Sequence, residues 1–191
     1  MYQQTVKQVE SIKPFYTEQS ARESVEKVKK PAFLHKRMQW MSSIPLYIPF
    51  WFVDVEMDLR DPKQKDLVQK SYTIMVNAIT NRGLLLKGNL RTEEIQTKAI
   101  FLEQEISAET ARETARVEAL VSTKRMMRPP PHRVLPGERL VWYPLALVEL
   151  LVNDQPEIQL FDYYRGGLDK MTMRFLRMKE KLSEKEKTKA G

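Results

Sequence analysis

The stretch TEQSARES at residues 17–24 recurs as SAETARET at residues 107–114, and this recurrence decides the fold that the sequence predicts. Two further stretches recur in the same order. LYIPFWFVDV at residues 46–55 is matched by VWYPLALVEL at residues 141–150, and NRGL at residues 81–84 is matched by RGGL at residues 165–168. The three matches lie 90, 95 and 84 residues apart. Because self-similar stretches that recur in the same order indicate a repeated structural unit, we expect one unit of about 90 residues to occur twice.

Each unit is predicted to contain a helix. Thr17 and Ser107 have hydroxyl groups that can accept a hydrogen bond from the first helical turn, and acidic residues follow them closely. The first helix is expected to end before Pro31 and the second before the prolines at positions 129–131. Their apolar faces consist of small residues that suit packing on a sheet: Ala21, Val25, Val28, Ala111, Ala115, Ala119 and Leu120.

Each helix is predicted to precede two antiparallel strands. In the first unit Trp51, Val53, Val55 and Met57 alternate with acidic residues, which is typical of a half-buried strand. A second strand at residues 71–80 would complete a hairpin, and residues 141–152 and 158–164 would form its counterpart. Pro49 and Pro144 are expected at the start of each apolar strand, at an edge or a bulge. Apolar stretches ahead of each helix could add one strand each.

The predicted fold class is α+β. We expect two similar units, each with a helix packed on an antiparallel β-hairpin or small sheet, followed by an amphipathic C-terminal helix. The predicted domain boundaries are residues 1–90, 91–167 and 168–191.

The pattern of the first unit resembles the PepSY-type α+β unit. The resemblance is carried by the helix TEQSARE, the aromatic strand YIPFWFVDV and the strand YTIMVNAITNRG at residues 72–83. Asn77 occupies a position where the family usually has aspartate, and Gly83 comes late. The resemblance implies an association with peptidase regulation, in proteins that are mostly extracytoplasmic or tethered to a membrane. It transfers no functional residue to this chain.

Composition limits the classes of function. The chain has 191 residues with 32 Lys and Arg against 25 Asp and Glu, a formal charge of +7, which favours an acidic partner. It has no cysteine, which excludes disulfides, thiolate nucleophiles and cysteine-based metal sites. The longest apolar runs, residues 44–53 and 140–152, are shorter than the ~20 residues of a spanning helix. With no signal-like N-terminal segment, a cytoplasmic protein without a transmembrane segment is expected.

Residues that could carry catalysis show no arrangement that favours an enzyme. His35 and His132 each lie in a basic connection, without further ligands at metal-binding spacing. Asp54, Glu56 and Asp58 share one face of a predicted strand and are best explained as a solvated face. The sequence predicts no catalytic residue, no metal site and no cofactor.

A basic patch is predicted between each helix and the following strand. Its candidate residues are Lys36, Arg37, Lys124, Arg125, Arg128 and Arg133. Three interpretations are open: nucleic-acid binding, binding of an acidic protein or lipid headgroup, and an ordinary solvated loop.

The C-terminal segment contains a heptad-like apolar seam. Its residues recur at spacings of three and four: Leu168, Met171, Phe175, Met178 and Leu182. The seam could pack on the protein's own sheet, dock on a partner or second copy, or lie on an anionic membrane. The leading hypothesis is a non-catalytic protein-interaction or regulatory module in which this helix binds a partner or drives self-association. The alternative is a nucleic-acid-binding protein that uses the basic loops.

Overall fold

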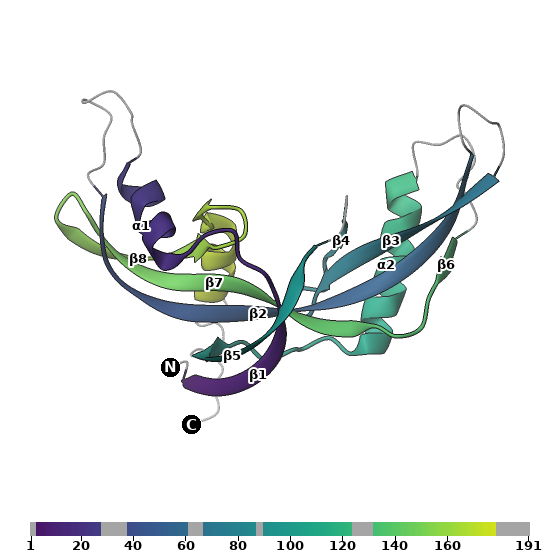
Figure 1. The fold of residues 1–191 in the computed structure, drawn as a ribbon, viewed down its shortest axis with the longest axis horizontal. Helices are drawn as coiled ribbons and strands as arrows, with labels where there is room; N and C mark the ends of the chain where they lie inside the picture. Colours follow the sequence, from purple (N-terminus) through teal and green to yellow (C-terminus); the bar gives the residue numbers. More distant parts are fainter. Residues whose placement is uncertain (1–2, 28–37, 61–66, 87–89, 124–131, 179–191) are drawn as a thin grey trace. The chain divides into compact units, whose positions relative to one another are not determined.

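The structure is a computed structural model, and it describes residues 3–27, 38–60, 67–86, 90–123 and 132–178 (Figure 1). Of these residues 55% are in strands and 23% in helices. The elements in chain order are β1 (Gln4–Ile12), α1 (Glu18–Glu26), β2 (Met38–Arg60), β3 (Leu67–Asn77), β4 (Gly83–Leu85), β5 (Thr92–Phe101), α2 (Ala108–Thr123), β6 (His132–Val134), β7 (Arg139–Val152), β8 (Gln155–Asp162) and β9 (Gly167–Leu168). A third helix covers residues 170–178.

The strands form a nine-stranded mixed sheet. The strand order is β4-β3-β2-β5-β1-β7-β8-β9; β6 pairs with β2, and β2 also pairs with β7. The single registered pair between β1 and β7, Ser11 with Trp142, is parallel, whereas β1–β5, β2–β3 and β7–β8 are antiparallel.

The chain divides into two compact units, and neither is a contiguous half of the sequence. Unit 1 comprises Met1–Lys13 and Tyr47–Tyr143, and unit 2 comprises Pro14–Leu46 and Pro144–Gly191. Both β2 and β7 therefore begin in one unit and end in the other.

Unit 1 contains the predicted β2–β3 hairpin, with α2 packed on it. The hairpin register runs from Phe50 opposite Asn77 to Arg60 opposite Leu67. Ala111, Ala115 and Ala119 are buried on the face that α2 turns toward the hairpin. They pack with a buried set of larger side chains from the two strands: Val53, Val55, Met57, Ile74 and Val76. Small residues on the helix let its backbone lie close to the sheet.

Unit 2 contains the predicted β7–β8 hairpin, with α1 packed on it. The register runs from Leu145 opposite Asp162 to Val152 opposite Gln155. Ala21 and Val25 of α1 are buried in a cluster with residues of β2, β7 and β8: Trp40, Ala146, Val148, Leu150, Val152 and Phe161. The rings of Trp40 and Phe161 meet edge to face with centroids 5.7 Å apart.

The predicted fold class is wrong. The sequence predicted two units in which each helix covers the hairpin of its own half, but the structure has one large sheet, and each helix covers the hairpin of the other half. The reason is the length of β2, which has 23 residues. Its first part, with Trp40, stays in the cluster of α1, whereas its later part, with Val53, carries the first hairpin into the other unit.

The two predicted strand prolines also lie elsewhere than expected. Pro49 and Pro144 are inside β2 and β7 rather than at their starts. A proline lacks an N–H but its carbonyl still accepts, and Pro49 accepts from the N–H of Ala78 at 3.0 Å while Pro144 accepts from Tyr163 at 3.3 Å. These bonds hold the chain just beyond the last residues of β3 and β8.

The second strand of each hairpin, β3 or β8, ends in a turn that a side chain stabilises by bonding to the backbone. Asn77 Oδ1 accepts from the N–H groups of Ile79 and Thr80 at 2.9 Å each. Asp162 Oδ1 accepts from Tyr164 and Arg165 at 2.8 Å each. A short side chain that bonds the backbone two and three residues ahead stabilises a turn, so β3 and β8 end at these residues.

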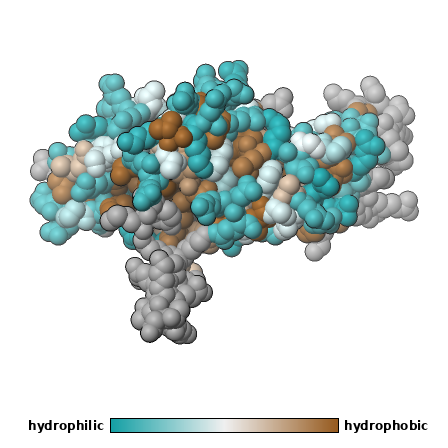
Figure 2. Space-filling model, turned by 90° about the horizontal axis from the view of Figure 1, so that it is seen from below, coloured by the Kyte–Doolittle hydropathy of each residue, from teal (hydrophilic) through white to brown (hydrophobic). Residues whose placement is uncertain are grey.

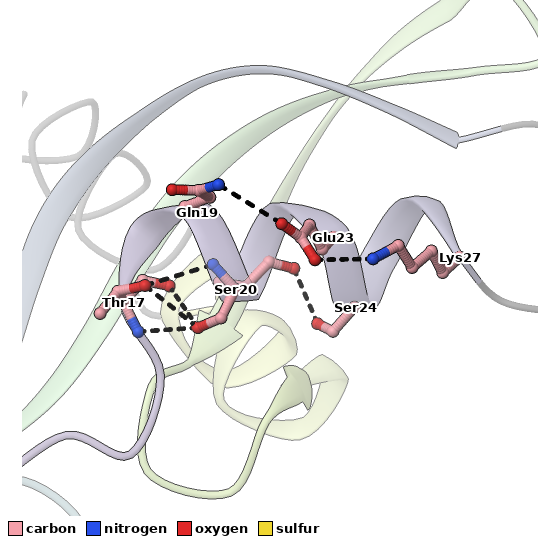
Figure 3. A network of polar contacts seen from close by, with 7 residues as sticks. Thr17, Gln19, Ser20, Glu23, Ser24 and Lys27 are labelled. Carbon is pink, nitrogen blue, oxygen red and sulfur yellow. Dashed lines mark hydrogen bonds and ion pairs between the residues drawn. The ribbon is translucent and has the colours of Figure 1, made fainter.

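The predicted N-cap of the first helix is confirmed (Figure 3). Ser20 N–H donates to Thr17 Oγ1 at 3.3 Å, and Thr17 N–H donates to Ser20 Oγ at 2.9 Å, which is a capping box. Further along α1, Lys27 Nζ lies 2.6 Å from a carboxylate oxygen of Glu23, and this hydrogen bond and charge lower the Glu23 pKa. Such local contacts start and support a helix of only nine residues.

Candidate interaction surface

The helix at residues 170–178 is fixed to the outer edge of β8. Asp169 Oδ1 accepts from Thr172 N–H at 3.0 Å and so caps the first turn. The Asp169 N–H donates to the carbonyl of Leu160 at 2.8 Å. At the other end, one residue before the last described helical residue, Arg177 Nη2 donates to the carbonyl of Ile158 at 2.8 Å. The helix is thus attached near both of its described ends.

One face of this helix is buried and the opposite face is exposed. Met173 and Leu176 are the buried residues, at 9% and 7% exposure. With 3.6 residues per turn, Met171, Phe175 and Met178 lie on the opposite side. Met171 is 73% exposed, Met178 is 54% exposed and Phe175 is half-buried. We call Met171, Phe175 and Met178 the exposed stripe.

A row of cations runs beside the exposed stripe. Lys170, Arg174 and Arg177 are spaced like the apolar residues, at i, i+4 and i+7, and are all exposed. Between positions 168 and 178 the one acidic residue is Asp169, whose carboxylate accepts from the backbone at the helix start. The helix therefore presents an apolar row and a positively charged row side by side.

The predicted C-terminal seam is divided by the structure. Leu168 lies in β9 and packs, partly buried, against the core cluster of unit 2. Met171, Phe175 and Met178 form the exposed stripe, and Leu182 lies outside the described residues. The buried residues of this helix are Met173 and Leu176, which the heptad pattern did not include.

One residue of the predicted basic patch is described. Arg133 lies in β6 and its guanidinium is 3.5 Å from a carboxylate oxygen of Glu56. Its side chain is 76% exposed, so the pair is solvated. The other predicted residues, Lys36, Arg37, Lys124, Arg125 and Arg128, lie outside the described residues. Nucleic-acid binding by this patch stays a prediction.

Two of the three predicted strand carboxylates, Asp54 and Glu56, accept hydrogen bonds from neighbouring side chains. Asp54 accepts from Thr73 Oγ1 at 2.6 Å, and Glu56 accepts from Gln69 Nε2 at 3.1 Å. His132 lies in β6, whereas His35 is outside the described residues. Among the residues that the structure describes, no group of three or more His, Asp or Glu side chains could hold a metal ion.

An aromatic cluster in unit 1 already holds a cation. The rings of Tyr47 and Phe101 are stacked at 5.2 Å, and Trp142 meets Phe101 edge-on at 5.0 Å. Lys7 Nζ lies 5.2 Å from the Phe101 centroid and 5.4 Å from that of Trp142. Burial, and then the charge of Glu93, raise the pKa of Tyr47. Lys7 makes the cation–π contact that this cluster could otherwise offer to a ligand.

Sequence reasoning missed a second exposed apolar row, on α2. Val117 is 57% exposed, Val121 is 54% exposed and Leu120, which was predicted to belong to the buried face, is 42% exposed. Their spacing opposite the alanine face is the signal that could have identified them. On the face drawn in Figure 2, hydrophobic side chains in brown reach the surface in several places between hydrophilic ones.

No protein-family model, curated protein or solved structure matches the chain.

In the described part of the chain, no helix has both the length and the hydropathy that crossing a membrane requires. The exposed stripe and the cation row are the surface features on which the proposed function rests. The resemblance to the PepSY-type unit stays a resemblance of sequence.

Proposed function

We propose that the protein is a non-catalytic protein-interaction module whose C-terminal helix binds a protein partner through the exposed stripe. The observation that carries the proposal is the exposure of Met171 and Met178, at 73% and 54%, on a helix whose other face is buried. Single exposed apolar residues are ordinary, but two exposed methionines with a half-buried phenylalanine between them on one helix face form the type of surface that helix-binding partners use.

The exposed stripe has the chemistry of an adaptable contact. Methionine side chains are flexible and polarizable, so they fit partner surfaces of different shape. Full burial of a methionine side chain contributes about 1.5–3 kcal/mol. Covering Met171 and Met178 can thus supply on the order of 3 kcal/mol, roughly a hundredfold in affinity.

The attachment of the helix supports the same function. Its first turn is bonded to Leu160 through Asp169, and its last described turn is bonded to Ile158 through Arg177. A helix that is ordered before binding loses less conformational entropy when a partner docks.

Point substitutions on the exposed face test the proposal better than truncation. Deleting residues 168–191 would also remove Leu168, Met173 and Leu176, which pack against the rest of unit 2 or are buried. We therefore choose the double variant Met171→Gln with Met178→Gln. The matched control is Met41→Gln, since Met41 in β2 is 51% exposed.

The experiment is affinity capture from extracts of the native host, identification of captured proteins by mass spectrometry, and titration of the purified partner. We expect the double variant to bind roughly a hundredfold more weakly, and Met41→Gln to bind like the unchanged protein. Equal affinity of the double variant and the control would refute the proposal.

A further inference from the structure

We infer that the partner presents an acidic amphipathic helix, with carboxylates that face the cation row and apolar side chains that cover the exposed stripe. The inference rests on the proposed function and names the chemistry of the partner. It is carried by the two parallel rows on residues 170–178, one apolar and one cationic.

The cation row lacks carboxylate partners within the described residues. No described Asp or Glu forms an ion pair with Lys170 or Arg174, and Asp169 is used to cap the helix. Arg177 donates through one nitrogen to Ile158, and a guanidinium has further N–H donors. Positive charge of this regularity is complemented by a partner with carboxylates at a helical spacing.

The geometry favours a helix over an added strand as the partner element. A strand could add to β8 only through free backbone groups on its outer edge. On that edge the carbonyls of Ile158 and Leu160 already accept from Arg177 and from the Asp169 N–H. A partner that docks beside this edge therefore has to bind through side chains. The exposed stripe and the cation row are each about 10 Å long, which matches two turns of a partner helix.

The charges are expected to set the choice and orientation of the partner more than the affinity. Exposed ion pairs contribute little each because water and salt screen them. They accelerate association and disfavour partners of like charge. Binding should consequently weaken as salt rises, and charge reversal should weaken it more than neutralisation.

The test is site-specific photo-cross-linking in the full-length protein, expressed in the native host. A benzophenone amino acid replaces Met171, and the cross-linked partner segment is sequenced by mass spectrometry. We expect a segment with Asp or Glu at i, i+4 or i+7 beside an apolar row. Cross-linking should fall at least fivefold when Lys170→Glu and Arg174→Glu are added. It should return when the carboxylates of that segment are changed to lysine.

Controls separate this inference from the proposed function. Lys98→Glu, at an exposed lysine of β5, should leave cross-linking unchanged, and the same benzophenone group at Met41 should not capture the segment. A captured segment without acidic residues would overturn the inference but leave the proposed function standing. A cross-linking yield that is the same with and without Lys170→Glu and Arg174→Glu would do so too. Capture of lipid alone, or of nothing, overturns both.

Discussion

Arg177 Nη2 donates a hydrogen bond to the backbone carbonyl of Ile158 at 2.8 Å, which ties the C-terminal helix to the outer edge of β8. The same edge receives the Asp169 N–H at Leu160. These bonds satisfy carbonyls that an edge strand would otherwise expose to pairing with another chain. The helix therefore protects the edge while it displays its opposite face.

Removing this bond should loosen the helix. We expect Arg177→Gln to lower the free energy of unfolding by about 1 kcal/mol, the usual contribution of one hydrogen bond. Urea titration followed by circular dichroism measures the change. Arg174→Gln is the control, since Arg174 is exposed on the same helix, and it should change stability by less than about 0.5 kcal/mol. Equal midpoints for both variants would show that the Arg177 bond contributes nothing.

Gly166 is predicted to tolerate no side chain. It has φ +73°, and a Cβ atom there would overlap the ring of Tyr16. Gly137 has φ +97° with nothing within 4 Å of such an atom, so Gly137→Ala reports backbone strain alone. We expect Gly166→Ala to cost about 1–3 kcal/mol more than Gly137→Ala, because overpacking adds to the strain. Thermal unfolding of both variants checks this. A smaller loss of stability in Gly166→Ala than in Gly137→Ala would contradict the described packing of Gly166 against Tyr16.

The Arg112–Glu138 pair is predicted to make stability depend on acid pH. Arg112 Nη2 lies 2.6 Å from Glu138 Oε1. The backbone N–H of Glu138 itself, and then the hydrogen bond and charge of Arg112, lower the Glu138 pKa, against the effect of burial. A lowered folded-state pKa stabilises the fold at pH values above the ordinary value of 4.5, and this contribution is lost as the pH falls through the folded-state pKa.

The measurement is urea unfolding of Glu138→Gln at pH 7 and at pH 3. We expect Glu138→Gln to lower the free energy of unfolding by about 1 kcal/mol at pH 7 and by less at pH 3. The expected value is small because the Arg112 side chain is 41% exposed and water weakens the ion pair. Glu113→Gln is the control, since its pair with Arg116 is exposed on both sides, and it should cost less than about 0.5 kcal/mol. A Glu138→Gln loss that does not shrink at pH 3 would contradict the assignment.

The alanine face of α2 should not accept a large side chain. Ala115 is fully buried between the helix and the β2–β3 hairpin. We expect Ala115→Leu to destabilise unit 1 by about 1–3 kcal/mol through overpacking. Val117→Leu, on the exposed side of the same helix, should be close to neutral. Denaturant unfolding measures the free energy of unfolding of both variants. Similar losses of stability in Ala115→Leu and Val117→Leu would mean that α2 is not packed as described.

Local elements were predictable from the sequence because their causes are local. The alternation around Val53 and Val55 identified β2, and hydrogen-bonded pairs with β3 confirm the predicted hairpin. The β7–β8 hairpin is confirmed in the same way. The hydroxyl of Thr17 identified the start of α1. The apolar stretch predicted at residues 6–12 lies in β1, whereas the one predicted at residues 99–106 overlaps β5 only at residues 99–101. The two strands pair with each other from Gln4 opposite Ile100 to Ile12 opposite Thr92.

The packing of helices on hairpins was not predictable, because a small apolar face fits more than one sheet. Ala21 and Val25 would suit the hairpin of either half, and the choice depends on the 23-residue course of β2. The same limit applies to the candidate surface. The spacing of Met171, Phe175 and Met178 marks one side of a helix, but it does not say whether that side faces the core. Met173 and Leu176 occupy the buried side instead.

Methionine footprinting tests the central claim most directly. Hydrogen peroxide oxidises accessible methionines to the sulfoxide, and peptide mass spectrometry reports the rate at each position. Without the partner, Met171 and Met178 should oxidise faster than Met173, which is 9% exposed. When the partner is bound, we predict at least fivefold slower oxidation at Met171 and Met178 and an unchanged rate at Met41. Oxidation of Met171 and Met178 at the same rate with and without the partner would contradict the account.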